Sequence, residues 1–172
     1  MKKLNTPWIG LHYDFGNSMM AWEDPAQAAR NMAPYTITTH FKDHIVIPYP
    51  DDPYGYVVCG IPVGKGNMDL KHLLQIILDN SSITRLNLEM CYPYCAQFNR
   101  TPGTGGISQV GEGCFKVEAP LFDPETVKPG DYYYPQEISE ELLEQCLKLQ
   151  MDGVMHSAAY TRKLCEEYRN QS

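Results

Sequence analysis

Residues 8–17 read WIGLHYDFGN, and the two faces of this stretch decide the expected fold. Every second residue of an extended strand points the same way, so His12 and Asp14 share a face with Trp8 and Gly10. The opposite face is apolar and carries Ile9, Leu11, Tyr13 and Phe15. The stretch therefore predicts a strand whose apolar face packs on a core and whose polar face ends in a carboxylate.

Two later segments repeat this design, TITTHFKD from Thr36 and TRLNLEM from Thr84. The polar face of the first is expected to hold Thr36, Thr38, His40 and Lys42. The polar face of the second is expected to hold Arg85, Asn87 and Glu89. An aspartate, a histidine and a glutamate are thus predicted at corresponding ends of three strands, which favours a site, because burying unpaired polar groups in a core is costly.

Helical patterns lie between these strands. Asp24-Pro25 resembles an N-cap followed by proline at the first helical position, and residues 69–80 place leucines and isoleucines at helical spacing. Alternating strands and helices favour parallel β/α units, whose ligands gather at the carboxyl ends of the strands. The intervening stretch 48–60 is rich in Pro, Asp, Tyr and Gly, and we expect it to be a loop that folds over the site as a lid.

The sequence predicts an α/β protein in which residues 1–98 form about the last three β/α units of a (β/α)8 TIM barrel. Residues 99–172 are expected to pack on the same domain as an irregular Gly/Pro-rich segment followed by a helical C-terminal tail. Two helices are predicted there, 139–150 and 154–168, separated near Gly153. The aromatic run Tyr132–Tyr134 is expected to pack against the body of the protein.

Composition narrows the class of protein. A chain of 172 residues can build one domain but is shorter than the roughly 250 residues of a complete TIM barrel. The net charge of −7 disfavours nucleic acid as a partner, since such binding rests on Lys and Arg. No apolar run approaches a membrane span, and the first residues lack the pattern of a signal peptide, so we expect a cytoplasmic protein whose six cysteines are reduced.

Asp14, His40 and Glu89 offer two carboxylates and an imidazole. This mixture of oxygen and nitrogen donors suits a divalent metal ion such as Mn, Mg, Co or Zn. The plain alternative is that each residue caps a strand or makes a structural hydrogen bond. Three such residues at equivalent strand ends favour a metal or catalytic site.

Five segments, HYDFGN, DPAQAA, THFKD, VGKGNMD and LNLEM, occur in this order within about residues 8–92. Together they resemble the second half of the xylose isomerase-like TIM-barrel superfamily of sugar-phosphate isomerases and epimerases. The resemblance implies that Asp14, His40 and Glu89 bind a metal and that Glu89 also acts as an acid or base. It implies that Lys42 contacts a substrate oxygen or a developing negative charge.

Weaker candidates for contact with substrate are His12, Asn17 and Lys65, and ordinary strand-end hydrogen bonding is the alternative for the first two. The turn at Gly64–Gly66 resembles the family's loop before its penultimate helix, which favours a conformational role over phosphate binding. The family's first five strands have no counterpart here, and neither does the fifth-strand glutamate that supplies another metal ligand and the partner acid or base. The expected partners are a sugar or sugar-phosphate substrate and either the missing N-terminal half or another copy of the chain.

The resulting hypothesis is a fragment or partial version of a metal-dependent sugar or sugar-phosphate isomerase or epimerase. Proton removal beside a carbonyl would give a metal-stabilised enediolate, followed by reprotonation. One alternative is a dehydratase or an aldolase-type enzyme that acts on keto-sugars or cyclitols. Another is a non-catalytic remnant or interaction subunit of the same fold, and the resemblance leaves open whether the chain is active alone.

Overall fold

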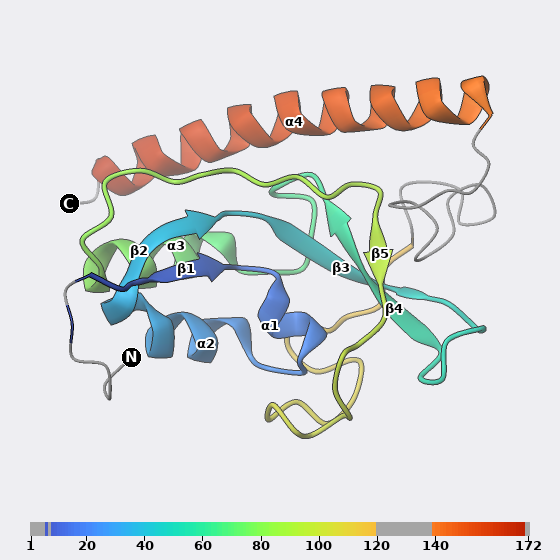
Figure 1. Cartoon of the computed structure of the whole chain (residues 1–172), viewed down its shortest axis with the longest axis horizontal. Helices are drawn as coiled ribbons and strands as arrows, with labels where there is room; N and C mark the ends of the chain where they lie inside the picture. Colours follow the sequence, from blue (N-terminus) through green and yellow to red (C-terminus); the bar gives the residue numbers. More distant parts are fainter. Residues whose placement is uncertain (1–5, 7, 120–138, 171–172) are drawn as a thin grey trace.

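A computed structural model describes residues 6, 8–119 and 139–170. The described residues form a mixed α/β structure with one long helix lying across it (Figure 1). In chain order the elements are β1 Leu11–Asp14, α1 Asn17–Met20, α2 Pro25–Met32, the 3-10 helix η1 Ala33–Tyr35, β2 Thr36–His40, β3 Asp43–Pro48, β4 Tyr56–Ile61, α3 Leu70–Asn80, β5 Cys95–Ala96 and α4 Glu140–Arg169. The Tyr132–Tyr134 cluster lies outside the described residues.

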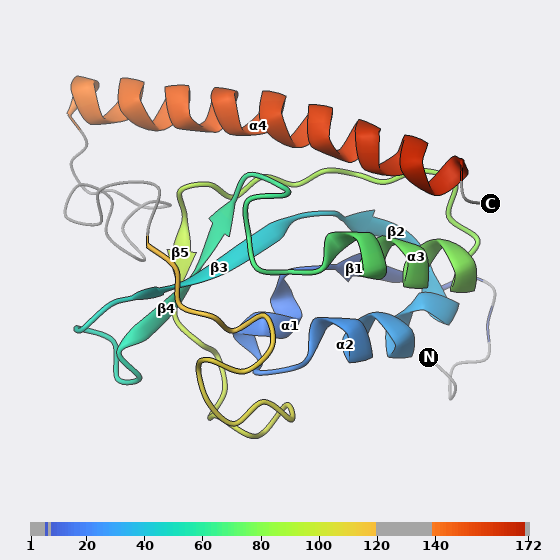
Figure 2. The same ribbon diagram turned by 180° about the vertical axis from the view of Figure 1, so that it is seen from behind.

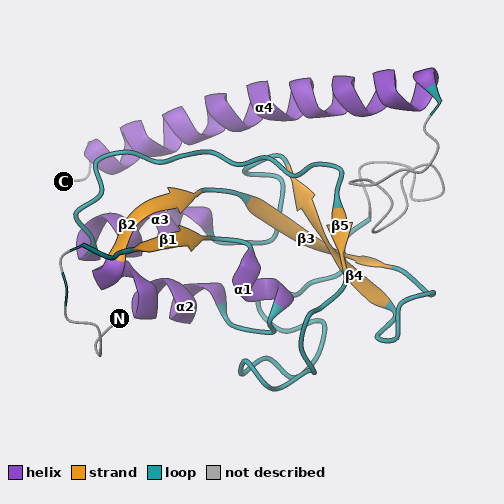
Figure 3. Ribbon diagram, in the orientation of Figure 1, coloured by secondary structure: helices purple, strands orange, loops and turns teal. Residues whose placement is uncertain are grey.

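The described strands form two small sheets, and neither of them closes on itself. β1 and β2 pair in parallel, with Asp14 opposite His40, whereas β3, β4 and β5 form an antiparallel sheet. The strand predicted over residues 84–90 is not formed, and these residues lie beside the end of β2 without regular secondary structure, drawn as loop in Figure 3. One parallel bridge joins Leu88 to Phe41. Three segments therefore run side by side in parallel, while a partial TIM barrel stays a prediction.

Helices α2 and α3 lie side by side against the apolar face of this parallel layer (Figure 2). Asp24 caps α2 by accepting a hydrogen bond from the Gln27 N–H, and Asp69 caps α3 in the same way through the His72 N–H. Both helices predicted from the sequence are thereby confirmed. The buried Phe15 and Phe41 rings meet edge to face at 4.9 Å beneath the layer. With the apolar side covered, the polar side of the strands is left open.

The prediction that residues 48–60 form a lid is wrong, because Tyr56–Ile61 is strand β4 and pairs with β3. The strand is an apolar run buried on both faces, which is typical of a core strand and not of a mobile loop. Only the turn from Tyr49 to Gly55 is irregular, and it is closed by a 2.9 Å hydrogen bond from the Tyr49 N–H to the Gly55 carbonyl.

The prediction of two C-terminal helices is also wrong, since α4 is one continuous helix of 30 residues. Ser139 caps its N-terminus, as expected. Gly153 does not break the helix; it allows close packing, because a Cβ at this position would lie 3.0 Å from the Met90 methyl carbon. The Ser157 hydroxyl accepts a 2.9 Å hydrogen bond from the Val63 N–H on the same side. Among the described helices, none combines the length and apolar character needed to cross a membrane.

The expectation of reduced cysteines is wrong for one pair. Cys59 on β4 and Cys95 on β5 form a disulfide. The antiparallel register places these two residues directly opposite each other, with their Cα atoms 4.0 Å apart. The pairing of strands so distant in sequence carries no local signal, so spacing alone gave no indication of it. Cys91, Cys114, Cys146 and Cys165 are thiols, as expected.

Candidate metal centre

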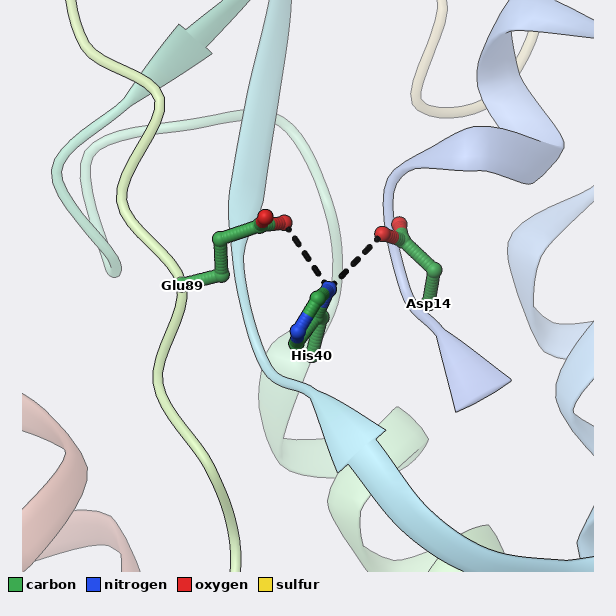
Figure 4. A group of neighbouring side chains, drawn as sticks. All are labelled: Asp14, His40 and Glu89. Atoms are coloured by element: carbon green, nitrogen blue, oxygen red, sulfur yellow. Dashed lines mark ion pairs between the residues drawn. The ribbon is translucent and has the colours of Figure 1, made fainter. Parts of the chain in front are cut away.

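Asp14, His40 and Glu89 converge at the carboxyl ends of the three parallel segments (Figure 4). One potential ligand atom from each residue lies within 4.8 Å of the others. The His40 Nδ1 atom is 3.6 Å from Asp14 Oδ2 and 3.2 Å from Glu89 Oε2. The strand pairing explains this convergence. Asp14 pairs with His40 in the register of β1 and β2, and Glu89 directly follows Leu88, which is bridged to Phe41.

Neighbouring groups orient two of the three side chains. Asp14 Oδ1 accepts hydrogen bonds from the N–H groups of Gly16 at 3.0 Å and Asn17 at 3.1 Å, which turns Oδ2 toward the cluster. The His12 ring meets the His40 ring edge to face at 4.0 Å. A preoriented carboxylate and imidazole are what a metal site requires, since partners of the ligands fix ligand geometry.

Lys42 adds a positive charge at the same place. Its Nζ atom lies 2.7 Å from Asp14 Oδ2, forms an ion pair with Glu89 Oε2 and is 3.8 Å from Cys91 Sγ. Burial alone would lower the pKa of Lys42, but its hydrogen bonds to Asp14 and Glu89 outweigh burial and leave the pKa raised. Lys42 is therefore an ammonium ion at neutral pH.

The donor set fits a divalent cation. Two carboxylate oxygens and one imidazole nitrogen match metals that prefer oxygen and nitrogen ligands. The Asp14 side chain is 15% exposed, and those of His40 and Glu89 are 37% and 34% exposed, while the Glu89 Oε2 atom that faces the cluster is itself buried. The carboxylates of Asp14 and Glu89 and the ammonium group of Lys42 carry a formal net charge of about −1, which favours uptake of a further cation.

The weaker candidates are not equally close to this centre. His12 and Asn17 line a cavity of about 570 Å³ beside Asp14, together with Asn99 and Arg100. Lys65 does not line it; it lies in the turn before α3, where its N–H bonds the Pro62 carbonyl. The structure thus places His12 beside His40 and Asn17 beside Asp14, and Lys65 does not line the cavity next to them.

The polar face of the second strand is shorter than predicted. Thr36 is buried, because the register between β1 and β2 shifts between the Leu11 and His12 pairings. Thr38 stays on the open face and accepts a 2.7 Å hydrogen bond from the Asn87 side chain. Arg85 is exposed, and within the described ranges it forms no ion pair with a carboxylate.

Asp43 and His44 directly follow Lys42 in the sequence, and both are buried. The Asp43 carboxylate accepts hydrogen bonds from the N–H groups of His44 at 2.9 Å, Gly64 at 3.0 Å and Gly66 at 2.8 Å. The glycine turn is thus held by an internal carboxylate, which agrees with a conformational role. A Cβ at Gly66 would lie 2.1 Å from Asp43 Oδ1, so glycine is required there. The signal for this burial was the apolar run Ile45–Ile47 that follows.

Burial also changes the ionisation of these two residues. Burial raises the pKa of Asp43 to about 6, although the backbone N–H groups act in the opposite direction. Burial, followed by the positive charge of Lys42, lowers the pKa of His44 to about 4. His44 packs so closely on Gly16 that a Cβ there would lie 1.7 Å from its ring. We interpret both residues as part of the framework beneath the centre.

The fold and the cluster define a mixed α/β protein with a candidate metal centre on an open parallel layer. Part of the chain is 32% identical over 92 residues to "Uncharacterized protein YihM" of Escherichia coli (strain K12). That match covers 51% of this chain and 27% of the length of the relative. No family model matches the chain. No solved structure matches it either.

Proposed function

We propose that the chain carries the metal-binding and proton-transfer part of a metal-dependent sugar or sugar-phosphate isomerase or epimerase. The observation that supports this function is the convergence of Asp14, His40 and Glu89 from three parallel segments, with their potential ligand atoms within 4.8 Å. The resemblance of the same segments to sugar-phosphate isomerases and epimerases supplies the reaction class. A site for a divalent cation alone would fit the geometry equally well, so the reaction needs its own test.

Asp14, His40 and Glu89 would hold the metal ion through Oδ2, Nδ1 and Oε2, the atoms that face one another. A bound divalent cation would supply a positive charge that draws electron density from a substrate carbonyl and acidifies the neighbouring C–H bond. Asp14 is well suited to hold such an ion, because its other oxygen is fixed by two backbone N–H groups.

Glu89 is the candidate for moving the proton. Its side chain is the more exposed of the two carboxylates in the cluster, so a substrate carbon can approach it. A carboxylate can take a proton from the carbon beside the carbonyl and return it to a neighbouring carbon or to the other face. The ammonium group of Lys42 would support the negative charge that develops on the substrate oxygen.

The cavity beside Asp14 is the candidate place for the rest of the substrate. Its volume of about 570 Å³ lies within the range of small-molecule sites. His12, Asn17 and Asn99 offer hydrogen bonds to hydroxyl groups, and Arg100 offers a positive charge to a phosphate. This lining favours a polar, hydroxylated substrate over an apolar one.

The test combines metal binding with proton exchange. Mn²⁺ binding is measured by calorimetry, and the exchange of carbon-bound hydrogen in ketohexoses and their phosphates is followed by NMR in D2O. Exchange requires only one base, so we expect it even where isomerisation needs a second residue. We expect Mn²⁺-dependent exchange in the natural chain and none in the His40→Ala/Glu89→Ala variant.

His156→Ala and Glu144→Gln on the exposed face of α4 are matched controls and should retain both properties. If Mn²⁺ affinity is the same in the His40→Ala/Glu89→Ala variant, these residues do not bind the metal ion and the proposed site is wrong. Saturable Mn²⁺ binding at the site, without exchange of carbon-bound hydrogen in any ketose, would contradict the proposed isomerase or epimerase reaction. In that case a non-catalytic interaction subunit is favoured, which would agree with the open sheets of the described residues.

A further inference from the structure

Two side-chain nitrogen atoms face the same pair of carboxylate oxygens. His40 Nδ1 and Lys42 Nζ both lie against Asp14 Oδ2 and Glu89 Oε2. These two oxygens are also those that a metal ion would need from Asp14 and Glu89, because Asp14 Oδ1 is already taken by backbone N–H groups. A metal ion and the ammonium group of Lys42 therefore compete for the same two atoms.

We propose that Lys42 is an internal counter-cation of the metal centre, which holds Asp14 and Glu89 together without metal and is displaced from them when a divalent cation binds. The proposal deepens the proposed function and rests on it in one respect, that Asp14, His40 and Glu89 bind one cation. It adds a sequence of events. The centre is preformed around an ammonium ion, metal uptake releases that ammonium ion, and the released group becomes available to an anionic substrate oxygen.

The burial of the lysine supports this role. The Lys42 side chain is 8% exposed, less than either of the carboxylates with which it pairs. Two carboxylates brought together without a positive charge would repel each other, and this repulsion grows as water is excluded. An internal ammonium ion removes the repulsion in the metal-free protein.

The same charge must oppose a metal ion. A divalent cation on Asp14 Oδ2 would stand a few ångströms from an ammonium group that keeps its 2.7 Å contact with that oxygen. Like charges at such a distance repel strongly in a partly buried site. Displacement of the ammonium group relieves this repulsion, so binding of the metal and contact of Lys42 with the two carboxylates exclude each other.

Lys42→Met tests the proposal, because methionine keeps much of the side-chain length but carries no charge. We expect Lys42→Met to bind Mn²⁺ at least about tenfold more tightly than the natural chain, because the competitor is lost and two uncompensated carboxylates remain. The control is Lys71→Met, an exposed lysine on α3 that should leave the affinity unchanged. Unchanged or weaker binding in Lys42→Met, with binding still lost in His40→Ala, would overturn the displacement and leave the metal site intact.

A second measurement needs no variant and so does not depend on the folding of Lys42→Met. Lysines of the natural chain are acetylated briefly with and without saturating Zn²⁺, and each site is quantified by mass spectrometry. We expect labelling of Lys42 to rise severalfold with Zn²⁺, while Lys71 and Lys163 stay constant. Labelling of Lys42 that stays constant or falls while calorimetry detects Zn²⁺ binding would overturn the proposal. Failure of the natural chain and Lys42→Met alike to bind either metal would remove the proposed function as well.

Discussion

Two histidines, His40 and His44, lie close together in the sequence but in opposite surroundings. His40 joins Asp14 and Glu89 on the open face of the parallel layer, where its side chain is 37% exposed. His44 and Asp43 come directly afterwards and are buried under the same layer. In the first group Asp14 Oδ2 and Glu89 Oε2 face the ammonium group of Lys42, whereas both oxygens of the Asp43 carboxylate accept hydrogen bonds from backbone N–H groups.

The comparison teaches that burial, not residue type, separates a candidate site from its framework. The Asp14 Oδ2 and Glu89 Oε2 atoms contact side chains, which can move away and be replaced by other partners. Asp43 cannot exchange its partners, because three N–H groups depend on it and they hold the turn before α3 in place. The account therefore predicts that changes at Asp43 and His44 act on stability, and that changes at Asp14, His40 and Glu89 act on metal binding.

The largest effect is expected for the metal ligands. His40→Ala should weaken Mn²⁺ binding about 100-fold or more, because one of three protein ligands is lost. Its free energy of unfolding should change by less than about 1 kcal/mol, since the side chain is partly exposed. Calorimetry and urea unfolding on the same sample check both values. If His40→Ala binds Mn²⁺ with normal affinity, or if its free energy of unfolding falls by much more than this, His40 acts as a structural residue like Asp43 and His44, and the prediction is wrong.

Asp43→Asn is the matched change in the framework. The amide nitrogen of asparagine cannot accept a hydrogen bond, so at least one of the three N–H groups would lose its partner at a cost of about 2–4 kcal/mol. Urea unfolding should show this loss, and Mn²⁺ affinity should change by less than about threefold. Asp79→Asn is the control: it is exposed and accepts a hydrogen bond from the Tyr168 hydroxyl, which asparagine can also accept. Equal stability of the two variants would contradict the role of Asp43.

The pH dependence of stability sharpens the comparison further. The pKa of His44 falls from 6.5 in the unfolded chain to about 4 in the fold, so acid protonates the unfolded chain first and destabilises the fold between about pH 6.5 and 4. The pKa of Asp43 rises from 3.8 to about 6, so its protonation stabilises the fold as the pH falls from about 6 toward 4. The two residues oppose each other across most of this range.

Removing one residue should expose the effect of the other. Relative to the natural chain, His44→Gln should gain on the order of 3 kcal/mol of unfolding free energy as the pH falls from 6.5 to 4, whatever its stability at pH 7. Asp43→Asn should show the opposite relative trend. Urea unfolding at several pH values measures both. If the free energies of unfolding of both variants change with pH in parallel with that of the natural chain, burial does not shift the pKa of either residue.

The smallest effect is expected at Asn87, which supports the segment that carries Glu89. Its side chain donates a 2.7 Å hydrogen bond to Thr38 across the open face. Asn87→Ala should cost about 0.5–1 kcal/mol of stability and weaken Mn²⁺ binding a few-fold, because Glu89 would be held less firmly. An unchanged affinity would mean that the single bridge between Leu88 and Phe41 positions Glu89 without this help.

Local patterns were enough to predict part of this molecule. The caps at Asp24 and Asp69 located α2 and α3. The alternation placed His12, Asp14 and His40 outside the core, but it did not indicate that Thr36 and Lys42 are buried and that Ile37 is exposed. The approach of Asp14, His40 and Glu89 followed from the parallel order of three segments. In each case the signal lies within a few residues of the feature that it predicts.

What the sequence did not reveal depends on distant partners. The disulfide between Cys59 and Cys95 requires a partner strand 36 residues away. Strand β4 itself pairs with the neighbouring strand β3, so its apolar run was a local signal that the prediction of a loop overlooked. The burial of Asp43 depends on N–H groups of a turn that arrives only at Gly64. The continuity of α4 through Gly153 depends on Met90 and Pro62, which approach too closely for a larger residue without some adjustment. Local sequence carries no information about such contacts.

The most direct test of the central claim is to locate a bound cation in solution. Mn²⁺ is titrated into ¹⁵N-labelled chain, and the paramagnetic broadening of backbone amides is mapped by NMR. The account predicts saturable broadening centred on residues 14, 40 and 89, and its loss in the His40→Ala variant. Broadening centred on Asp43 and His44, or on the acidic start of α4, or no saturable broadening at all, would contradict the account.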